Sequence, residues 1–324
     1  MIINGHGLNR LFRPVGQTTN TLIGLTLTGG YTTQDGGAIL NDSVLTIDRC
    51  VIRENIANEA GAIFNFGTLT VNNSTIVGNR ARFAGAIEQD GFTGPVTLNN
   101  CTFAHNVATN DSGAILNFFD LILNHCTVVG NQASYGGGIN DEGTLYLTNC
   151  IIAGNMAINN PSTAQIAGSI DRSGGINIIS TNAMVSPLGD YGGPTPTMPP
   201  LPGSPAIDPA GGHTNSVFAT DQRGLPRVVN GIVDVGAVEV QSTSAAPIQI
   251  TGAAILGDGS FQLSLSNLTG ASFQVLASTN VALPASNWPT LGLASEMPPG
   301  SGQFQFTDPQ ATNHVQRYYR VKSP

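Results

Sequence analysis

The chain has 324 residues, of which 10% are charged and 40 are glycine, and its formal net charge at pH 7 is −8. This composition is typical of turns and stacked strands rather than of amphipathic helices. The negative charge and the lack of a Lys/Arg cluster argue against nucleic acid and anionic membranes as partners. No apolar run reaches the about 18 residues of a bilayer-spanning helix, so we expect no transmembrane segment.

The first twelve residues, MIINGHGLNRLF, lack the basic start and the long apolar core of a signal peptide. They resemble part of a repeat instead, and residues 22–30 (LIGLTLTGG) fit one coil of the repeat that follows. Because solenoids need polar terminal caps to prevent end-to-end growth, we expect the natural chain to start further upstream. An export signal is then expected in that upstream part.

A Gly-Ala-Ile-like triplet recurs five times, and its isoleucines are spaced by 24, 24, 28 and 24 residues. These isoleucines are Ile39, Ile63, Ile87, Ile115 and Ile139. A fixed period of this length is the signature of a solenoid. The one longer interval contains an insertion at residues 88–95 (EQDGFTGP).

Within each repeat, apolar residues two apart indicate short strands, and steps of three between apolar sets indicate corners. Each coil should hold about three strands that pair in parallel with the same strands of the next coil, about 4.8 Å away. The sequence therefore predicts an all-β fold, with a right-handed, single-stranded parallel β-helix of the pectin-lyase type over residues 1–160. A leucine-rich repeat competes, because Leu121 to Asn131 matches its core pattern, but too few residues follow the asparagine to form its helix.

Stacked coils place like residues above one another in two further columns. One column contains Cys50, Ser74, Cys101, Cys126 and Cys150, and the other contains Asn55, Asn79, Asn106, Asn131 and Asn155. Coil spacing holds stacked Cβ atoms further apart than a relaxed disulfide prefers, and stacked thiols cannot converge on one metal ion. We therefore expect buried free thiols. The asparagines are predicted to form a hydrogen-bonded ladder and to adopt the left-handed backbone of a turn.

After Asn160 the repeat gives way to a dense run of motifs. The run contains LGDYGGPTPTMPPLPGSPAID (188–208), TDQRGLPR (220–227) and DVGAVE (234–239). It closely resembles the signature of the choice-of-anchor Q domain, which follows a right-handed β-helix in bacterial exported proteins. The preceding repeats resemble those of polymorphic outer-membrane proteins. This resemblance covers roughly residues 20–240 and implies a surface or secreted β-helix protein without an agreed chemistry, with residues 161–240 as the C-terminal closure of the solenoid.

The same run concentrates charge in a chain that is otherwise poor in it. Its charged residues are Asp208, Asp221, Arg223, Arg227, Asp234 and Glu239. Arginine forks bind carboxylates bidentately, and buried charges must be paired. We therefore predict an Arg–carboxylate network that closes the C-terminal end of the solenoid, with a Ca²⁺ or substrate site as the alternative.

A Ser/Thr/Ala-rich linker at residues 241–247 separates this segment from a C-terminal domain over residues 248–324. Strand-like alternation interrupted by Gly, Pro, Asn and Asp predicts a small β-sandwich there. The words ASTN (277–280) and RYYRV (317–321), with Trp288 between them, resemble a C-terminal module of exported bacterial proteins. Attachment to a surface would then be non-covalent or handled by a secretion system.

No complete catalytic or metal-binding set appears, so we assign no catalytic, cofactor-binding or metal-ligating residue and expect no cofactor. The GHG triplet at residues 5–7 is seen in polygalacturonases, but their paired aspartates and Arg-x-Lys are missing. Acids in the column Asp42, Phe66, Asp90, Phe118 and Glu142 recur every second coil, about 9.6 Å apart. One Ca²⁺ ion cannot bridge that gap.

That column does suggest a ligand face. Its members and their upstream neighbours are Phe64, Phe66, Asp90, Leu116, Phe118 and Glu142, all expected to point outward. Apolar rings interleaved with carboxylates often hold sugars, although residues 161–205 or the C-terminal domain could instead cover the face. We therefore expect a monomeric, extracellular or cell-surface structural protein of adhesin type that binds a polysaccharide or cell-envelope component. A polysaccharide lyase or glycoside hydrolase is the alternative, and a pure stalk is a third candidate.

Overall fold

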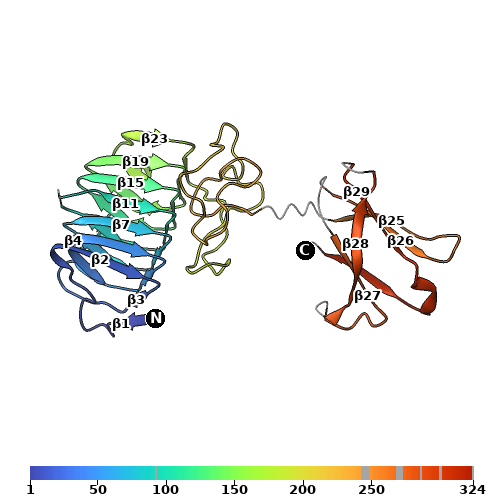
Figure 1. The fold of residues 1–324 in the computed structure, drawn as a ribbon. Coiled ribbons are helices and arrows are strands. Elements are labelled where there is room, and N and C mark those ends of the chain that lie inside the picture. The colour runs from blue at the N-terminus through green and yellow to red at the C-terminus, as the bar shows by residue number, and fades with distance from the viewer. Residues whose placement is uncertain (92, 242–247, 268–272, 285–286, 299–300, 323–324) are drawn as a thin grey trace. The chain divides into compact units, whose positions relative to one another are not determined.

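The computed structural model describes residues 1–91, 93–241, 248–267, 273–284, 287–298 and 301–322. The chain forms two compact units, Met1–Gln241 and Ser242–Pro324 (Figure 1). Of the expected linker, residues 242–247 lie outside the described part of the chain. The first unit is a stack of parallel coils with a long irregular segment beside it, and the second is antiparallel.

Three long parallel sheets and one short one form the walls of the solenoid. Sheet A consists of β1 (Ile2–Asn4), β3 (Thr26–Thr28), β5 (Val51–Arg53), β8 (Thr75–Val77), β12 (Thr102–Ala104), β16 (Thr127–Val129), β20 (Ile151–Ala153) and β24 (Ile178–Ser180). Sheet B carries the triplet isoleucines on β4 (Ile39–Asp48), β6 (Ile63–Asn65), β10 (Ile87–Gln89), β14 (Ile115–Asn117), β18 (Ile139–Asp141) and β22 (Ile166–Ala167).

Strand β4 runs round a corner, so it also belongs to sheet C. The other strands of sheet C are β2 (Val15–Ile23), β7 (Thr68–Asn72), β11 (Val96–Asn99), β15 (Asp120–Asn124), β19 (Thr144–Thr148) and β23 (Arg172–Gly174). Sheet D consists of β9 (Arg80–Phe83), β13 (Val107–Asp111), β17 (Gln132–Ala133) and β21 (Met156–Ala157).

The coils stack in register, as the sequence columns predict. Leu98, for example, pairs with Val71 in the coil before it and with Leu123 in the coil after it. The described residues contain no α-helix, so the leucine-rich repeat alternative is wrong. The parallel β-helix is confirmed, and its early coil at residues 22–30 places Leu27 beside Ile52 as expected.

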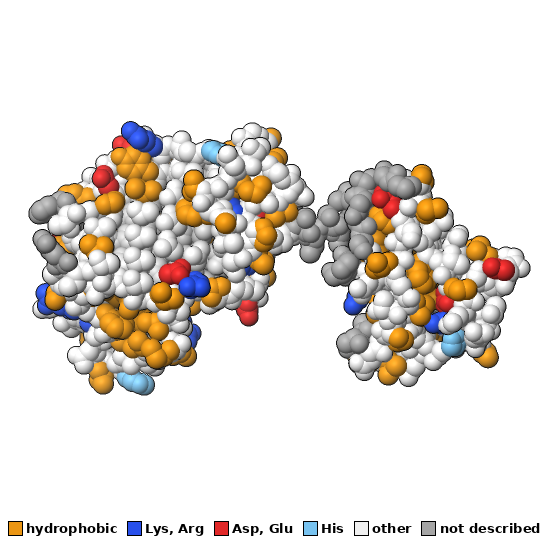
Figure 2. All heavy atoms as spheres, in the orientation of Figure 1, with side chains coloured by type: hydrophobic (Ala, Val, Ile, Leu, Met, Phe, Trp, Pro, Cys, Tyr) orange, Lys and Arg blue, Asp and Glu red, His pale blue; other side chains and the backbone are white. Residues whose placement is uncertain are grey.

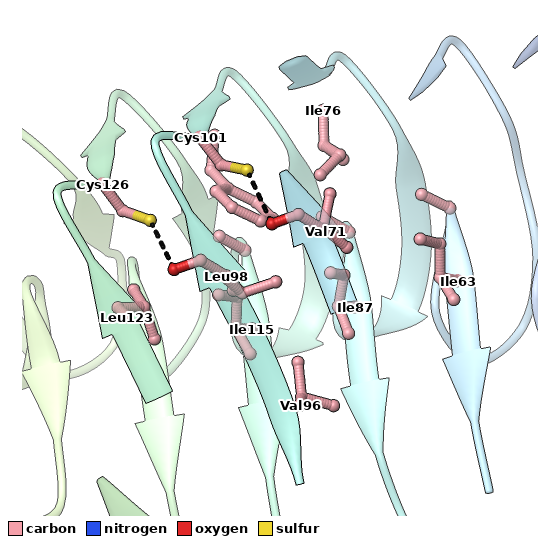
Figure 3. Close-up of a cluster of buried hydrophobic side chains, with 14 of the residues drawn as sticks. Ile63, Val71, Ile76, Ile87, Val96, Leu98, Cys101, Ile115, Leu123 and Cys126 are labelled. Carbon is pink, nitrogen blue, oxygen red and sulfur yellow. Dashed lines mark hydrogen bonds between the residues drawn. The ribbon is translucent and has the colours of Figure 1, made fainter. Parts of the chain in front are cut away.

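The interior of the solenoid is a continuous apolar core built from these columns (Figure 3). All four cysteines lie in this core as free thiols, which confirms the prediction. Each thiol donates a hydrogen bond to a backbone carbonyl oxygen of the preceding coil. Cys101 Sγ lies 3.4 Å from the Val71 carbonyl oxygen, and Cys126 Sγ lies 3.3 Å from that of Leu98.

The predicted asparagine ladder is present and fully buried in its middle. Asn79 Nδ2 donates to Asn106 Oδ1 at 3.0 Å, and Asn106 Nδ2 donates to Asn131 Oδ1 at 2.9 Å. The expected left-handed backbone at these asparagines is wrong, because the residue before each one has the positive φ, as at His105 (55°) and Gly130 (70°). The residue before each asparagine adopts the left-handed backbone at the corner of the coil. The asparagine itself points its side-chain amide inward, where it reaches the asparagines of the neighbouring coils.

A second amide ladder, which the sequence reasoning missed, lies at the corner between sheets B and C. Asn41 Nδ2 donates to Asn65 Oδ1 at 2.6 Å, and Asn117 Nδ2 donates to Asp141 Oδ1 at 2.6 Å. Between these pairs, Gln89 Nε2 turns to the carbonyl oxygens of Gly91 and Gly94 in the insertion. The insertion is thereby tied to the solenoid by a side chain of the ladder itself.

The solenoid continues past Asn160, because β22, β23 and β24 pair with the coil before them. Residues 181–240 then pack along the outer face of sheet A. Met198, Ala206 and Val235 contact the apolar outer residues of that sheet, which are Ala104, Val129, Ile151 and Ala153. The segment therefore lies along the side of the solenoid, whereas it was expected to close the C-terminal end. The physical reason is that the apolar side chains on the outer face of sheet A must be shielded from water.

The charged residues of this segment form part of the predicted network. Arg223 pairs with Asp221 at 2.8 Å. Arg227 is fully buried but donates to the carbonyl oxygens of Gly236 and Ala237 and to Asn100 Oδ1, rather than to a carboxylate. Burial lowers the pKa of Arg227 to about 10, so the guanidinium keeps its charge at neutral pH. The network joins the segment to the side of the solenoid.

The C-terminal unit confirms the expected small β-domain. Its strands are antiparallel, in the order β25 (Gln249–Ile255), β26 (Phe261–Ser266), β29 (Gln303–Asp308), β28 (Thr290–Glu296), β27 (Phe273–Ser278) and β30 (Tyr318–Lys322). They curve as a half-barrel over a separate core that includes Leu265, Phe273 and Phe304.

Candidate functional site

The face of sheet C that Figure 2 turns toward the viewer carries few charged side chains over its middle. Its outward residues include Thr70 and Thr97 and, on the next coils, Ile122 and Tyr146. Asn72, Asn99 and Asn124 form an additional, half-buried amide ladder along it, with 2.9 Å between successive Nδ2 and Oδ1 atoms. The acidic groups of the predicted ligand face lie on sheet B instead.

The outer side of sheet B has a floor formed by the residue after each triplet isoleucine. This floor column contains Leu40, Phe64, Glu88, Leu116 and Asn140. Phe64 is 2% exposed and Leu116 is 3% exposed, so the expectation that they form an outward ridge is wrong. The corner between sheets D and B folds over the floor, and Ala60 in that corner packs against Leu40 and Phe64.

One wall of the face is the column predicted from the sequence. Phe66, Asp90, Phe118 and Glu142 occupy equivalent positions on successive coils. Phe66 is 38% exposed, and its ring centroid lies 4.8 Å from that of the buried Phe64. Asp90 and Glu142 are exposed, whereas Phe118 is half-buried and lines a cleft of about 250 Å³ with Pro95 and Thr144.

Of the two expected covers, the segment 161–205 does not lie at this face. Residues 181–205 make their described apolar contacts with sheet A, through side chains such as Leu188 and Met198. Residues 161–180 form the last coil of the stack, where Ile166 pairs with Ile139. The segment 161–205 therefore leaves the outer side of sheet B open.

The opposite wall was not found from the sequence. It follows sheet D and stacks Asp35, Glu59, Phe83, Asp111 and Tyr135 through successive parallel bridges. The acids in this column belong to different coils, so only the coil-to-coil register brings them to one side of the molecule. The column keeps the spacing of 24, 24, 28 and 24 residues of the triplet isoleucines, but it was not recognised in the sequence because it mixes acids with aromatic residues.

Glu88 lies in the floor between these walls, and the sequence reasoning missed it as well. It pairs laterally with Phe64 and Leu116 and is only 5% exposed. Its Oε2 atom is buried and has no hydrogen-bond partner. Burial raises the pKa of Glu88 to about 8, and the carboxylates around it add to this shift. Glu88 is the only charged residue of the floor column. The alignment of the coils shows this exception, so it could have identified Glu88 from the sequence.

The raised pKa of Glu88 predicts a pH-dependent stability. The folded state keeps the proton that the unfolded chain loses near pH 4.5, so stability falls as pH rises from about 4.5 to about 8. This group alone contributes a slope of up to about 1.4 kcal/mol per pH unit. We expect Glu88→Gln to be more stable than the wild type at pH 8, with a difference that shrinks toward pH 5, in urea unfolding.

The exposed Glu54 provides the control for this measurement, because its side chain is 65% exposed. Glu54→Gln makes the same chemical change at an exposed position, so a difference between the two variants reports on the burial of Glu88. Parallel curves for wild type and Glu88→Gln over this pH range would show that Glu88 is ionised in the folded protein.

The face offers negative charge, hydrogen-bond acceptors and aromatic surface. Across the described residues, no group of three or more His, Cys, Asp or Glu side chains is placed to hold a metal ion. No helix in that part of the chain is long and apolar enough to cross a membrane.

Comparison with known proteins adds no further identification. No protein-family model, no curated protein and no solved structure matches this chain.

Proposed function

We propose that this protein is an extracellular or surface-displayed binding scaffold, in which the outer side of sheet B holds a glycan. The observation that carries the proposal is the column in which the exposed Phe66 and the half-buried Phe118 alternate with the exposed Asp90 and Glu142. Phenyl rings two coils apart are separated by about 9.6 Å along the solenoid axis. Such a spacing is too long for adjacent sugars, so two non-adjacent sugars of one chain lie on the two rings while the carboxylates between them accept hydrogen bonds from the hydroxyl groups.

The placement outside the cell and the adhesin-like role are supported by the resemblance of residues 188–239 to the choice-of-anchor Q signature. A rigid solenoid suits display, because each coil contacts only its neighbours and the stack presents a long, regular surface. We propose that the protein acts as a monomer.

Removal of the two rings tests this proposal. Phe66→Ala with Phe118→Ala should abolish retention on a glycan array, since each lost ring contact weakens binding by about tenfold. Thermal unfolding should change little for Phe66, because its ring is 38% exposed. Tyr146→Ala on sheet C is the matched control and should bind as the wild type does. Unchanged glycan retention in the double variant would refute the proposal, and a large loss of stability would show that the rings belong to the core.

A polysaccharide lyase or glycoside hydrolase is the second candidate, and Glu88 is the observation that favours it. Its carboxyl group, with a pKa of about 8, is a proton donor at neutral pH beside the more exposed Asp90. General acid catalysis needs such a group near a base. A reducing-end assay on polysaccharides separates the two candidates: binding without new ends supports the scaffold, and new ends support the enzyme. A stalk would produce neither result.

A further inference from the structure

The face on sheet B is acidic on both sides of its floor. Asp35, Glu59 and Asp111 follow sheet D, and Asp90 and Glu142 follow the opposite wall. Burial and neighbouring carboxylates raise the pKa of Glu59 and of Asp90. The acids therefore lie close enough to disfavour one another's ionisation, which is the condition of a site with an excess of negative charge.

Two arginines, Arg10 and Arg82, lie beside this cluster and neutralise only part of its negative charge. Arg10 directs its guanidinium to the backbone carbonyl oxygens of Asp35 and Gly36, at 2.7 to 3.0 Å. Arg82 is exposed, lies over the Phe83 ring at 4.9 Å and lowers the pKa of Glu59.

Glu88 supplies an independent sign of a ligand. The charges of Glu59, Asp90, Asp35 and Asp111 all act on the Glu88 carboxyl, so this group lies within the acidic cluster. Oε2 is buried and unpartnered, and the residues beside Glu88 on the neighbouring coils are Phe64 and Leu116. A buried carboxyl oxygen without a partner is costly and calls for an explanation such as an unoccupied donor position.

We propose that the glycan held by this face is cationic, built from sugars with free amino groups, and that one ammonium group lies over Glu88 between the acidic walls. This inference rests on the glycan-binding function proposed above and names its ligand class. An ammonium group is attracted by the carboxylates and can donate hydrogen bonds to them, whereas a uronic acid polymer meets like charge on both sides. The apolar faces of the sugars would lie on Phe66 and Phe118.

If an ammonium group lies over Glu88, ligand binding should release a proton from this carboxyl group. A positive charge above Glu88 favours its ionised form, so binding lowers the pKa of this carboxyl from about 8. At pH 7 the complex should therefore release up to one proton per ammonium bound at Glu88. Calorimetric titration in two buffers with different ionisation enthalpies measures that release directly.

The test uses the full chain and three β-1,4- or α-1,4-linked oligomers of equal length, made of glucosamine, N-acetylglucosamine and galacturonic acid. The first two differ at the amine alone. We expect the glucosamine oligomer to bind at least tenfold more tightly than the acetylated one, with release of a proton, and the uronate to bind most weakly. Glu88→Gln should abolish the proton release, and Asp90→Asn should weaken binding several-fold. Glu54→Gln, remote in sequence and exposed, should change neither.

Each outcome decides one of the two claims. Equal or tighter binding of the acetylated or uronate oligomer would leave the glycan-binding function standing and overturn the cationic ligand class. Tight glucosamine binding without proton release would overturn the position over Glu88. Failure of all three oligomers and of a wider glycan array to bind would overturn the proposed function itself.

Discussion

Asn106→Asp should destabilise the solenoid by about 3–5 kcal/mol, because it breaks the buried amide ladder and buries an unpaired charge. Asn106 Nδ2 donates to the Ile76 carbonyl oxygen and to Asn131 Oδ1, and a carboxylate can donate to neither. The carboxylate would also face Asn131 Oδ1 as a second acceptor. Urea unfolding at pH 7 measures the loss, which should become smaller in acid because a protonated carboxyl regains one donor.

Asn99→Asp is the matched control for this change. Asn99 belongs to the half-buried ladder on sheet C, where its Nδ2 donates to Asn72 Oδ1 at 2.9 Å. Solvent can hydrate the new charge there, so the expected loss is about 1 kcal/mol or less. Equal losses in the two variants would show that burial of the inner ladder does not determine its contribution.

Arg227→Ala should cost about 3–5 kcal/mol and release the segment 181–240 from the side of the solenoid. Arg227 is the largest fully buried side chain, and it links Asn100 of the solenoid to the backbone of Gly236 and Ala237. Its removal takes this donor from the Gly236 oxygen and Asn100 Oδ1, while the Ala237 oxygen keeps the Gln222 amide, and it removes a positive charge that acts on Asp221. Limited proteolysis should then cut within the segment at protease levels that leave the wild type intact.

Arg82→Ala is the control for the loss of one arginine, because Arg82 is exposed. Its unfolding free energy should stay within about 0.5 kcal/mol of the wild type. Unchanged proteolysis of the Arg227→Ala protein would mean that the apolar contacts of Met198 and Val235 alone hold the segment in place.

The repeating part of the fold was readable from the sequence because stacking in register makes each column chemically uniform. A column of isoleucines, of cysteines or of asparagines reports directly on a shared environment, as Cys101 and Cys126 illustrate by their equivalent bonds to the coil before. The exposed aromatic and acidic residues Phe66 and Asp90 were found by the same alignment.

The burial of side chains beside the core columns could not be read in that way. Phe64 follows a core isoleucine by one residue, and only the corner containing Ala60 decides that it is buried. Likewise the motifs after residue 188 give no indication of which surface they cover, since their contacts with Ala104 and Val129 span more than 60 residues of sequence.

The amino-acid sequence by itself determined the solenoid, its coil register, the thiol column and the buried amide ladder, because each of these depends on residues repeated at one period. The tertiary structure alone decided that the charges of Asp35, Glu59 and Asp111 act on Glu88, and that residues 181–240 lie along sheet A. These are relations between different columns and between non-repeating segments. Their geometry depends on how sharply each corner bends and on which apolar surface remains uncovered, and neither is encoded in a local pattern.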